Sequence, residues 1–151
     1  MTWQTSSTNS SVTEHIAETI GLNLKGGEVI ELVSDLGGGK TTFVRGLARG
    51  MGSSDRVSSP TFKISNEYQG KYFKLYHFDF YRLPEAGLVA DELAEIIGEP
   101  QNVTVVEWAD IVQNVLPRKR LTIVFTNKGE NDRGVAFTYP KSLAYLMKGS
   151  I

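Results

Sequence analysis

The sequence contains no cysteine, no excess of charge of one sign and no long apolar run. The absence of cysteine excludes disulfides, zinc ribbons and thiol catalysis, and it is compatible with a reducing compartment. Lysine and arginine number 16 against 17 acidic residues, which gives a formal net charge of -1. Because this balance produces no global field toward nucleic acid or an anionic membrane, any contact with RNA has to be local or provided by a partner.

The N-terminal segment, residues 1–12, is polar and rich in serine and threonine, with neither a positively charged start nor an apolar centre. No apolar run in the sequence approaches the roughly 20 residues that span a membrane. We therefore expect a cytoplasmic protein that makes no contact with a membrane. Since 40% of the 151 residues are hydrophobic, we expect a single domain over residues 1–151 with a real core.

One segment predicts a phosphate-binding loop, because the apolar run EVIELV is followed by the glycine-rich turn SDLGGGKTT and the amphipathic stretch FVRGLARGM. The consecutive Gly37, Gly38 and Gly39 let the backbone curl, so that N–H groups and a helix N-terminus point at one anion. Lys40 would then reach the β- and γ-phosphates of a nucleotide, and the Thr41 hydroxyl would ligate Mg²⁺.

The loop departs from the phosphate-loop consensus at one position. The pattern GxxxxGK[ST] requires glycine six residues before the lysine, and this chain has Ser34 there. The context still favours a phosphate loop over a flexible glycine turn, since a strand precedes the loop and Phe43, Val44 and Leu47 follow it at helical spacing.

The remaining segments indicate an α/β fold of the P-loop NTPase type: a single domain with a central mixed β-sheet, flanking helices and β-hairpins. Thr13 is a candidate N-cap for a first helix that ends near Leu24. The expected later elements are a hairpin over 61–68 and 71–81, a helix from Pro84, a strand over 103–107, a short helix to Val115, a hairpin over 120–125 and 133–140, and a last helix from Pro140.

Hydrolysis or transfer of a phosphoryl group also requires an acid near the metal. Glu107 follows an apolar run, which places it at the carboxyl end of a buried strand, where ligands bind in open α/β sheets. Asp79 lies near another strand end, and both carboxylates are expected to face the metal or the γ-phosphate. Thr61, in the motif SSPTF, is a candidate switch residue, although the spacing alone favours a simple turn that enters a strand. His77 is interpreted as a packed or hydrogen-bonded structural residue rather than a general base.

The ordered motifs SDLGGGKTTFVRG, VSSPTF, HFDFYRL and VVEWADIV, followed by Leu116-Pro117, together resemble the TsaE family, formerly called YjeE. The resemblance covers about residues 13–139. It implies a small ATPase that is required for threonylcarbamoyl modification of adenosine in the tRNA anticodon loop. It also implies a TsaB–TsaD heterodimer as partner, with TsaC making the activated intermediate and tRNA contacted through the complex.

The resemblance also implies roles for single residues. Residues 37–42 would hold the phosphates of ATP, with Lys40, Thr61, Asp79 and Glu107 in catalysis. The cofactor-binding set would be Gly37, Gly38, Gly39, Lys40, Thr41, Thr42, Glu14 and Arg133, and the metal ligands would be Thr41 and Glu107. The family has glycine where this chain has Ser34, so ATP affinity depends on whether serine strains the loop.

Two other functions remain open on the sequence. The first is a small-molecule kinase, which would need an arginine-rich lid and an acceptor pocket, and no arginine cluster follows the helices here. The second is a scaffold that binds ATP without needing to hydrolyse it. The guanine-reading motif NKxD is approached at Asn127 and Lys128 but lacks its aspartate, so adenine is the expected base.

Overall fold

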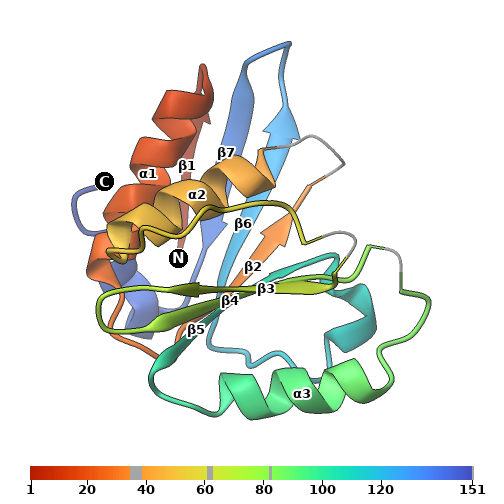
Figure 1. The fold of residues 1–151 in the computed structure, drawn as a ribbon. Helices are drawn as coiled ribbons and strands as arrows, with labels where there is room; N and C mark the ends of the chain where they lie inside the picture. The colour runs from red at the N-terminus through yellow and green to blue at the C-terminus, as the bar shows by residue number, and fades with distance from the viewer. Residues whose placement is uncertain (35–38, 61–62, 82, 151) are drawn as a thin grey trace.

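The computed structural model describes residues 1–34, 39–60, 63–81 and 83–150. Within these residues, seven strands form one mixed sheet in the order β1-β7-β6-β2-β5-β4-β3 (Figure 1). The strands are β1 (Thr2–Ser7), β2 (Val29–Val33), β3 (Ser65–Gln69), β4 (Lys74–Asp79), β5 (Asn102–Glu107), β6 (Leu121–Asn127) and β7 (Arg133–Thr138). The helices are α1 (Ser10–Asn23), α2 (Lys40–Gly50) and α3 (Leu88–Ile97), with 3₁₀ helices η1 (Ala109–Val112) and η2 (Lys141–Met147).

The centre of the sheet is parallel. Strand β2 pairs in parallel with β5 and β6, and β5 pairs in parallel with β4. The outer strands β1, β7 and β3 pair with their neighbours in antiparallel fashion. Strands β2 and β5 are buried along most of their length because helices cover both sides of the sheet, as is usual for parallel strands. The carboxyl ends of β2, β5 and β4 therefore meet at one edge.

The helices lie in two layers (Figure 1). Helices α1 and α2 pack on one face, in the same apolar cluster as η2, and the cluster on the other face contains α3 and η1. This arrangement confirms the expected α/β architecture with a mixed sheet and flanking helices. Across the described part of the chain, every helix is too short or too polar to cross a lipid bilayer.

Several element boundaries differ from the sequence predictions. Helix α1 begins earlier than expected, because the Asn9 side chain and not Thr13 caps it by accepting from the Val12 N–H at 3.0 Å. Thr13 lies inside the helix, where its hydroxyl hydrogen-bonds the Ser7 hydroxyl at 2.6 Å. Helix α3 begins at Leu88 and not at Pro84. The last two predicted helices are both 3₁₀ helices.

Helices α1 and α2 approach each other backbone to backbone. A Cβ atom on Gly46 would lie 2.3 Å from the Glu14 carbonyl oxygen, and one on Gly50 would lie 2.2 Å from that of Glu18. Gly21 makes the reciprocal approach from α1, where an added Cβ would lie 2.9 Å from the Gly50 Cα. These glycines are needed for close packing, since any side chain would force the helices apart.

We predict that Gly46→Ala lowers the free energy of unfolding by about 2 kcal/mol through overpacking. Helix propensity alone would change it by about 1 kcal/mol in the opposite direction, so the sign separates the two effects. The measurement is urea denaturation. Gly98→Ala, where an added Cβ would meet its nearest atom at 3.5 Å, is the matched control and should change stability by less than about 0.5 kcal/mol. A stabilised Gly46→Ala protein would contradict the close approach.

Candidate functional site

The N-terminus of α2 is built to receive an anion. Gly39 precedes the helix with a left-handed backbone, φ 99, and among the described residues no side chain caps the helix. A Cβ added to Gly39 would meet no described atom within 4 Å. The first N–H groups of an α-helix have no partner within it and attract phosphate groups. Lys40, Thr41 and Thr42 form this first turn, so α2 begins three residues before the stretch from Phe43 that the sequence predicted as helix, whereas Gly37 and Gly38 lie outside the described residues.

Ser34 is accommodated without backbone strain. Among the described non-glycine residues, only Ile64 and Trp108 have positive φ. The glycine of the consensus is therefore not required here for its left-handed freedom. The Ser34 carbonyl oxygen accepts a hydrogen bond from Lys40 Nζ at 3.2 Å, so the serine end of β2 helps to place the lysine.

Glu107 and Lys40 form a buried ion pair at the carboxyl end of β5. Glu107 Oε1 lies 3.6 Å from Lys40 Nζ, and the two side chains are only 4% and 7% exposed. The other carboxylate oxygen, Oε2, accepts a hydrogen bond from His77 Nε2. A buried charge is tolerated only when it is paired, and Glu107 is paired on both oxygens.

Asp79 stands beside Glu107, because the two residues are register partners on the adjacent parallel strands β4 and β5. Asp79 is buried, and its Oδ1 accepts from the Tyr81 N–H at 3.0 Å. Its own N–H donates to the Ile64 carbonyl oxygen at 2.8 Å, which ties this strand end to the segment after SSPTF. Thr61 itself lies outside the described residues, so its role as a switch residue stays a prediction.

Trp108 closes the site at one side. Its backbone is left-handed, φ 54, which turns the chain sharply after β5. The half-buried indole lies 4.6 Å below Lys40 Nζ and 5.0 Å from the Tyr81 ring, measured to ring centres. A cation over an aromatic face is favourable, so Trp108 helps to hold the lysine rather than only filling the core.

The carboxylates of Glu107 and Asp79 are suited to a metal ion whose remaining ligands are phosphate oxygens and water. No cluster of three or more His, Cys, Asp or Glu side chains in the described ranges is arranged to hold a metal alone. Mg²⁺ in phosphate-transfer sites uses one or two carboxylates together with phosphate oxygens and water. The Thr41 hydroxyl at the start of α2 and the carboxylate of Glu107 provide oxygen donors of this kind, so the donor set fits Mg²⁺ bound together with a phosphate.

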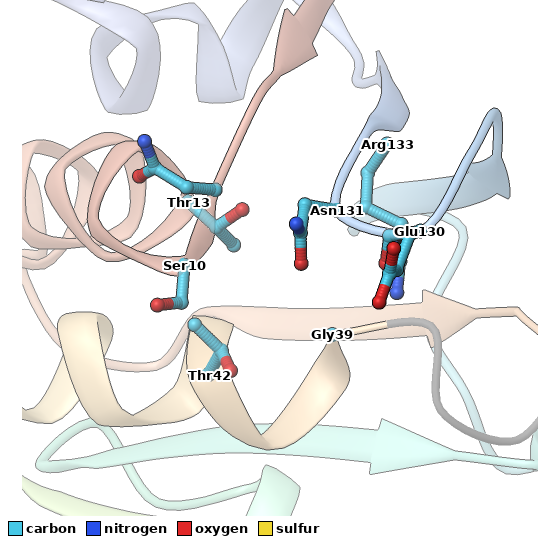
Figure 2. Close-up of a pocket in the computed structure, with 8 residues that line it drawn as sticks. Ser10, Thr13, Gly39, Thr42, Glu130, Asn131 and Arg133 are labelled. Atoms are coloured by element: carbon cyan, nitrogen blue, oxygen red, sulfur yellow. The ribbon is translucent and has the colours of Figure 1, made fainter.

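A pocket of about 380 Å³ opens next to the N-terminus of α2. It lies between the N-termini of α1 and α2 and the turn that joins β6 to β7 (Figure 2). The described residues that line it are Asn9, Ser10, Thr13, Gly39, Thr42, Glu130, Asn131 and Arg133. Its volume is within the range of small-molecule sites.

Arg133 and Glu14 were both expected to contact a nucleotide, and the structure separates them. Arg133 lines the pocket, and its Nη1 also donates to the Gly129 carbonyl oxygen at 3.1 Å, which braces the turn. Glu14 instead accepts from Arg45 at 3.1 Å and Arg49 at 2.9 Å. Burial acts to raise the pKa of Glu14, but the two guanidinium groups hold that pKa below its ordinary value.

The direction in which Glu14 projects from α1 explains why it does not line the pocket. Its neighbour Thr13 faces the pocket, whereas Glu14 is turned toward α2 and is not among the described lining residues. The side chain therefore belongs to the contact between α1 and α2. Sequence reasoning also missed Asn9, Ser10 and Asn131, which contribute polar groups to the wall. The serine and asparagine run before α1 was the available signal, since such residues gather at helix N-termini.

The strand, glycine turn and Lys-Thr helix start, with acids at neighbouring strand ends, define a P-loop NTPase-like α/β protein. Comparison with known proteins narrows this class. The family described as "Threonylcarbamoyl adenosine biosynthesis protein TsaE" matches residues 7–135. The chain therefore belongs to the TsaE family.

Individual relatives agree with this assignment. The chain is 40% identical over 138 residues to the tRNA threonylcarbamoyladenosine biosynthesis protein TsaE of Bacillus subtilis, covering 90% of this chain and 84% of that protein. The Aquifex aeolicus protein of the same name is 43% identical over 100 residues, covering 65% of this chain and 70% of that protein. The crystal structure of Bacillus subtilis YdiB superimposes with a TM-score of 0.78 at 33% identity, covering 98% of this chain and 93% of that one.

We predict that Lys40 and Glu107 are energetically coupled. Lys40→Met should lower the free energy of unfolding by about 2–4 kcal/mol, because it leaves a buried carboxylate without its cation. The double variant Lys40→Met/Glu107→Gln should lose less than the sum of the two single losses. Urea denaturation of all four proteins measures the coupling, and losses that add to within about 0.5 kcal/mol would contradict the ion pair.

Proposed function

We propose that this protein is a Mg²⁺-dependent ATPase that acts in threonylcarbamoyl modification of tRNA adenosine, together with a TsaB–TsaD heterodimer. The observation that supports it most is the buried contact between Lys40, at the start of α2, and Glu107, at the end of β5. That contact brings the phosphate-binding lysine and a strand-end carboxylate to one point, which is the pairing that phosphoryl transfer needs.

Each residue of the site has a distinct part in this proposal. The first turn of α2 binds the phosphates through its N–H groups, and Lys40 stabilises the charge that develops on the transferred phosphoryl group. Thr41 and Glu107 would hold Mg²⁺, which neutralises phosphate charge when it is bound. Asp79, the register partner of Glu107, is placed to orient a water molecule beside it.

The pocket between α1, α2 and the β6–β7 turn is suited to the nucleoside part of ATP. It adjoins Gly39 and Thr42, so a nucleotide whose phosphates lie on the first turn of α2 would extend into it. Arg133 lines the opposite wall on the turn (Figure 2). The polar lining offers hydrogen-bond partners for a ribose and a base.

The role in tRNA modification is supported by the family to which the chain belongs and by the names of its relatives. The formal net charge of -1 provides no general attraction for RNA. We therefore assign the tRNA contact to the partner proteins, with ATP turnover here serving to reset the complex.

We predict that Lys40→Ala and Glu107→Gln affect nucleotide binding and turnover differently. Lys40→Ala should reduce ATP turnover by at least about 100-fold, because a positioned charge at the transferring group is lost. Glu107→Gln should lose turnover to a similar extent while it binds ATP within about threefold of the wild type. Fluorescent-nucleotide titration and phosphate release measure the two effects. Normal hydrolysis by Lys40→Ala would refute the proposal, and equal loss of binding and turnover in Glu107→Gln would instead indicate a binding-only role.

We also predict nucleotide-dependent association with purified TsaB and TsaD. Pull-down should recover the heterodimer with Mg-ATP and recover much less of it without nucleotide. The Lys40→Ala protein is the matched control and should not respond to nucleotide.

Reconstituted tRNA modification should fail with a nonhydrolysable ATP analogue. Full modification with that analogue would favour the scaffold function, and ADP release stimulated by hydroxylated metabolites would favour a kinase.

A further inference from the structure

Among the described residues of the site, His77 is buried and has no part in the proposed chemistry. It lies on β4, two residues before Asp79, and its side chain is fully buried, with 0% exposure. Its register partner on β5 is Val105, and Glu107 follows two residues later on the same face. The imidazole therefore extends along the sheet toward the Glu107 carboxylate, which it contacts through Nε2.

The surroundings of the ring identify which nitrogen carries the proton. Nε2 faces the Glu107 carboxylate, which can only accept when it is ionised. Nδ1 is buried and has no hydrogen-bond partner among the residues that the structure describes. A proton on Nδ1 would leave a buried donor unsatisfied, which is unfavourable. This arrangement favours the Nε2–H tautomer, in which the ring donates to Glu107.

The two oxygens of Glu107 consequently have different surroundings. Oε2 is occupied by the His77 donor, and Oε1 faces Lys40 Nζ at 3.6 Å. A carboxylate held by one oxygen cannot rotate freely, so the other oxygen keeps its direction toward the start of α2. Groups behind a metal-binding carboxylate commonly orient it in this way.

We propose that His77 is a positioning residue, which holds the Glu107 carboxylate so that Oε1 is directed to the metal and lysine side of the site. This inference rests on the proposed function, because it assigns Glu107 to the metal–nucleotide complex. His77 acts through Glu107 alone, since a fully buried ring has no contact with water or substrate. It is therefore distinct from a general base.

The tautomer is tested first, on the wild-type protein without nucleotide. The chain has only two histidines, and a His15→Gln variant assigns their nitrogen resonances. Long-range ¹H–¹⁵N NMR should show His77 as the Nε2–H tautomer. The Nδ1–H tautomer would overturn the inference, whatever the protein does with ATP.

The second test compares two amides at position 77. The His77→Gln side chain can place its NH₂ group near the position of Nε2, whereas the His77→Asn side chain is too short to reach Glu107. We expect His77→Asn to raise the Mg²⁺ concentration for half-maximal stimulation of ATP binding by about tenfold. His77→Gln should stay within about threefold of the wild type, and metal-free ATP affinity should not change in either variant.

Leu75→Val is the matched control, because Leu75 is a fully buried residue on the same strand and face and bears no polar group. It should lower the melting temperature without moving the Mg²⁺ midpoint. An unshifted midpoint in His77→Asn, or equal defects in the Asn and Gln variants, would overturn the inference. Wild-type protein that binds no ATP with Mg²⁺ would refute the proposed function as well, so the two failures are distinguishable.

Discussion

The site depends on one physical constraint, which is that a carboxylate removed from water must be compensated. Glu107 is 3% exposed at the end of a central strand. Lys40 from α2 and His77 from β4 compensate it, so this one side chain joins α2, β4 and β5 at the carboxyl edge of the parallel strands. The arrangement explains why the sheet order matters for chemistry. Only with β5 between β2 and β4 do the loop, the acid and the histidine meet.

Much of this arrangement could be predicted from local sequence. Runs of β-branched residues indicated β2 and β5, and the acid after the second run indicated a strand end at the ligand-binding edge. Lys40 and Thr41 were assigned to a phosphate-binding turn directly before a helix, which in the structure already begins at Lys40. These features could be predicted because each depends on a few neighbouring residues and on the general geometry of parallel sheets.

Features that depend on contacts distant in sequence could not be predicted in the same way. Glu14 and Thr13 are adjacent, but the helix phase sends one to α2 and the other to the pocket. Arg133 lies near the start of α1 because β7 pairs with β1, with Arg133 opposite Ser7, and no local pattern reveals this pairing of distant strands. At Ser34 the consensus glycine suggested a left-handed backbone, but Ser34 does not have a positive φ. A sequence pattern shows which residue is preferred at a position, and it does not show the backbone angle at that position in a given chain.

The glycine contact between α1 and α2 has a consequence for the shape of the pocket beside them. The first turns of these helices form two walls of the pocket. The close approach of Gly46 to the Glu14 backbone lies about one helical turn from these walls. Helices that touch through their backbones cannot adjust their spacing by exchanging side chains. The third wall is the β6–β7 turn, whose length and composition are free to vary. A change in the shape of the pocket is therefore expected mainly through that turn, while the paired helices keep the other two walls in place.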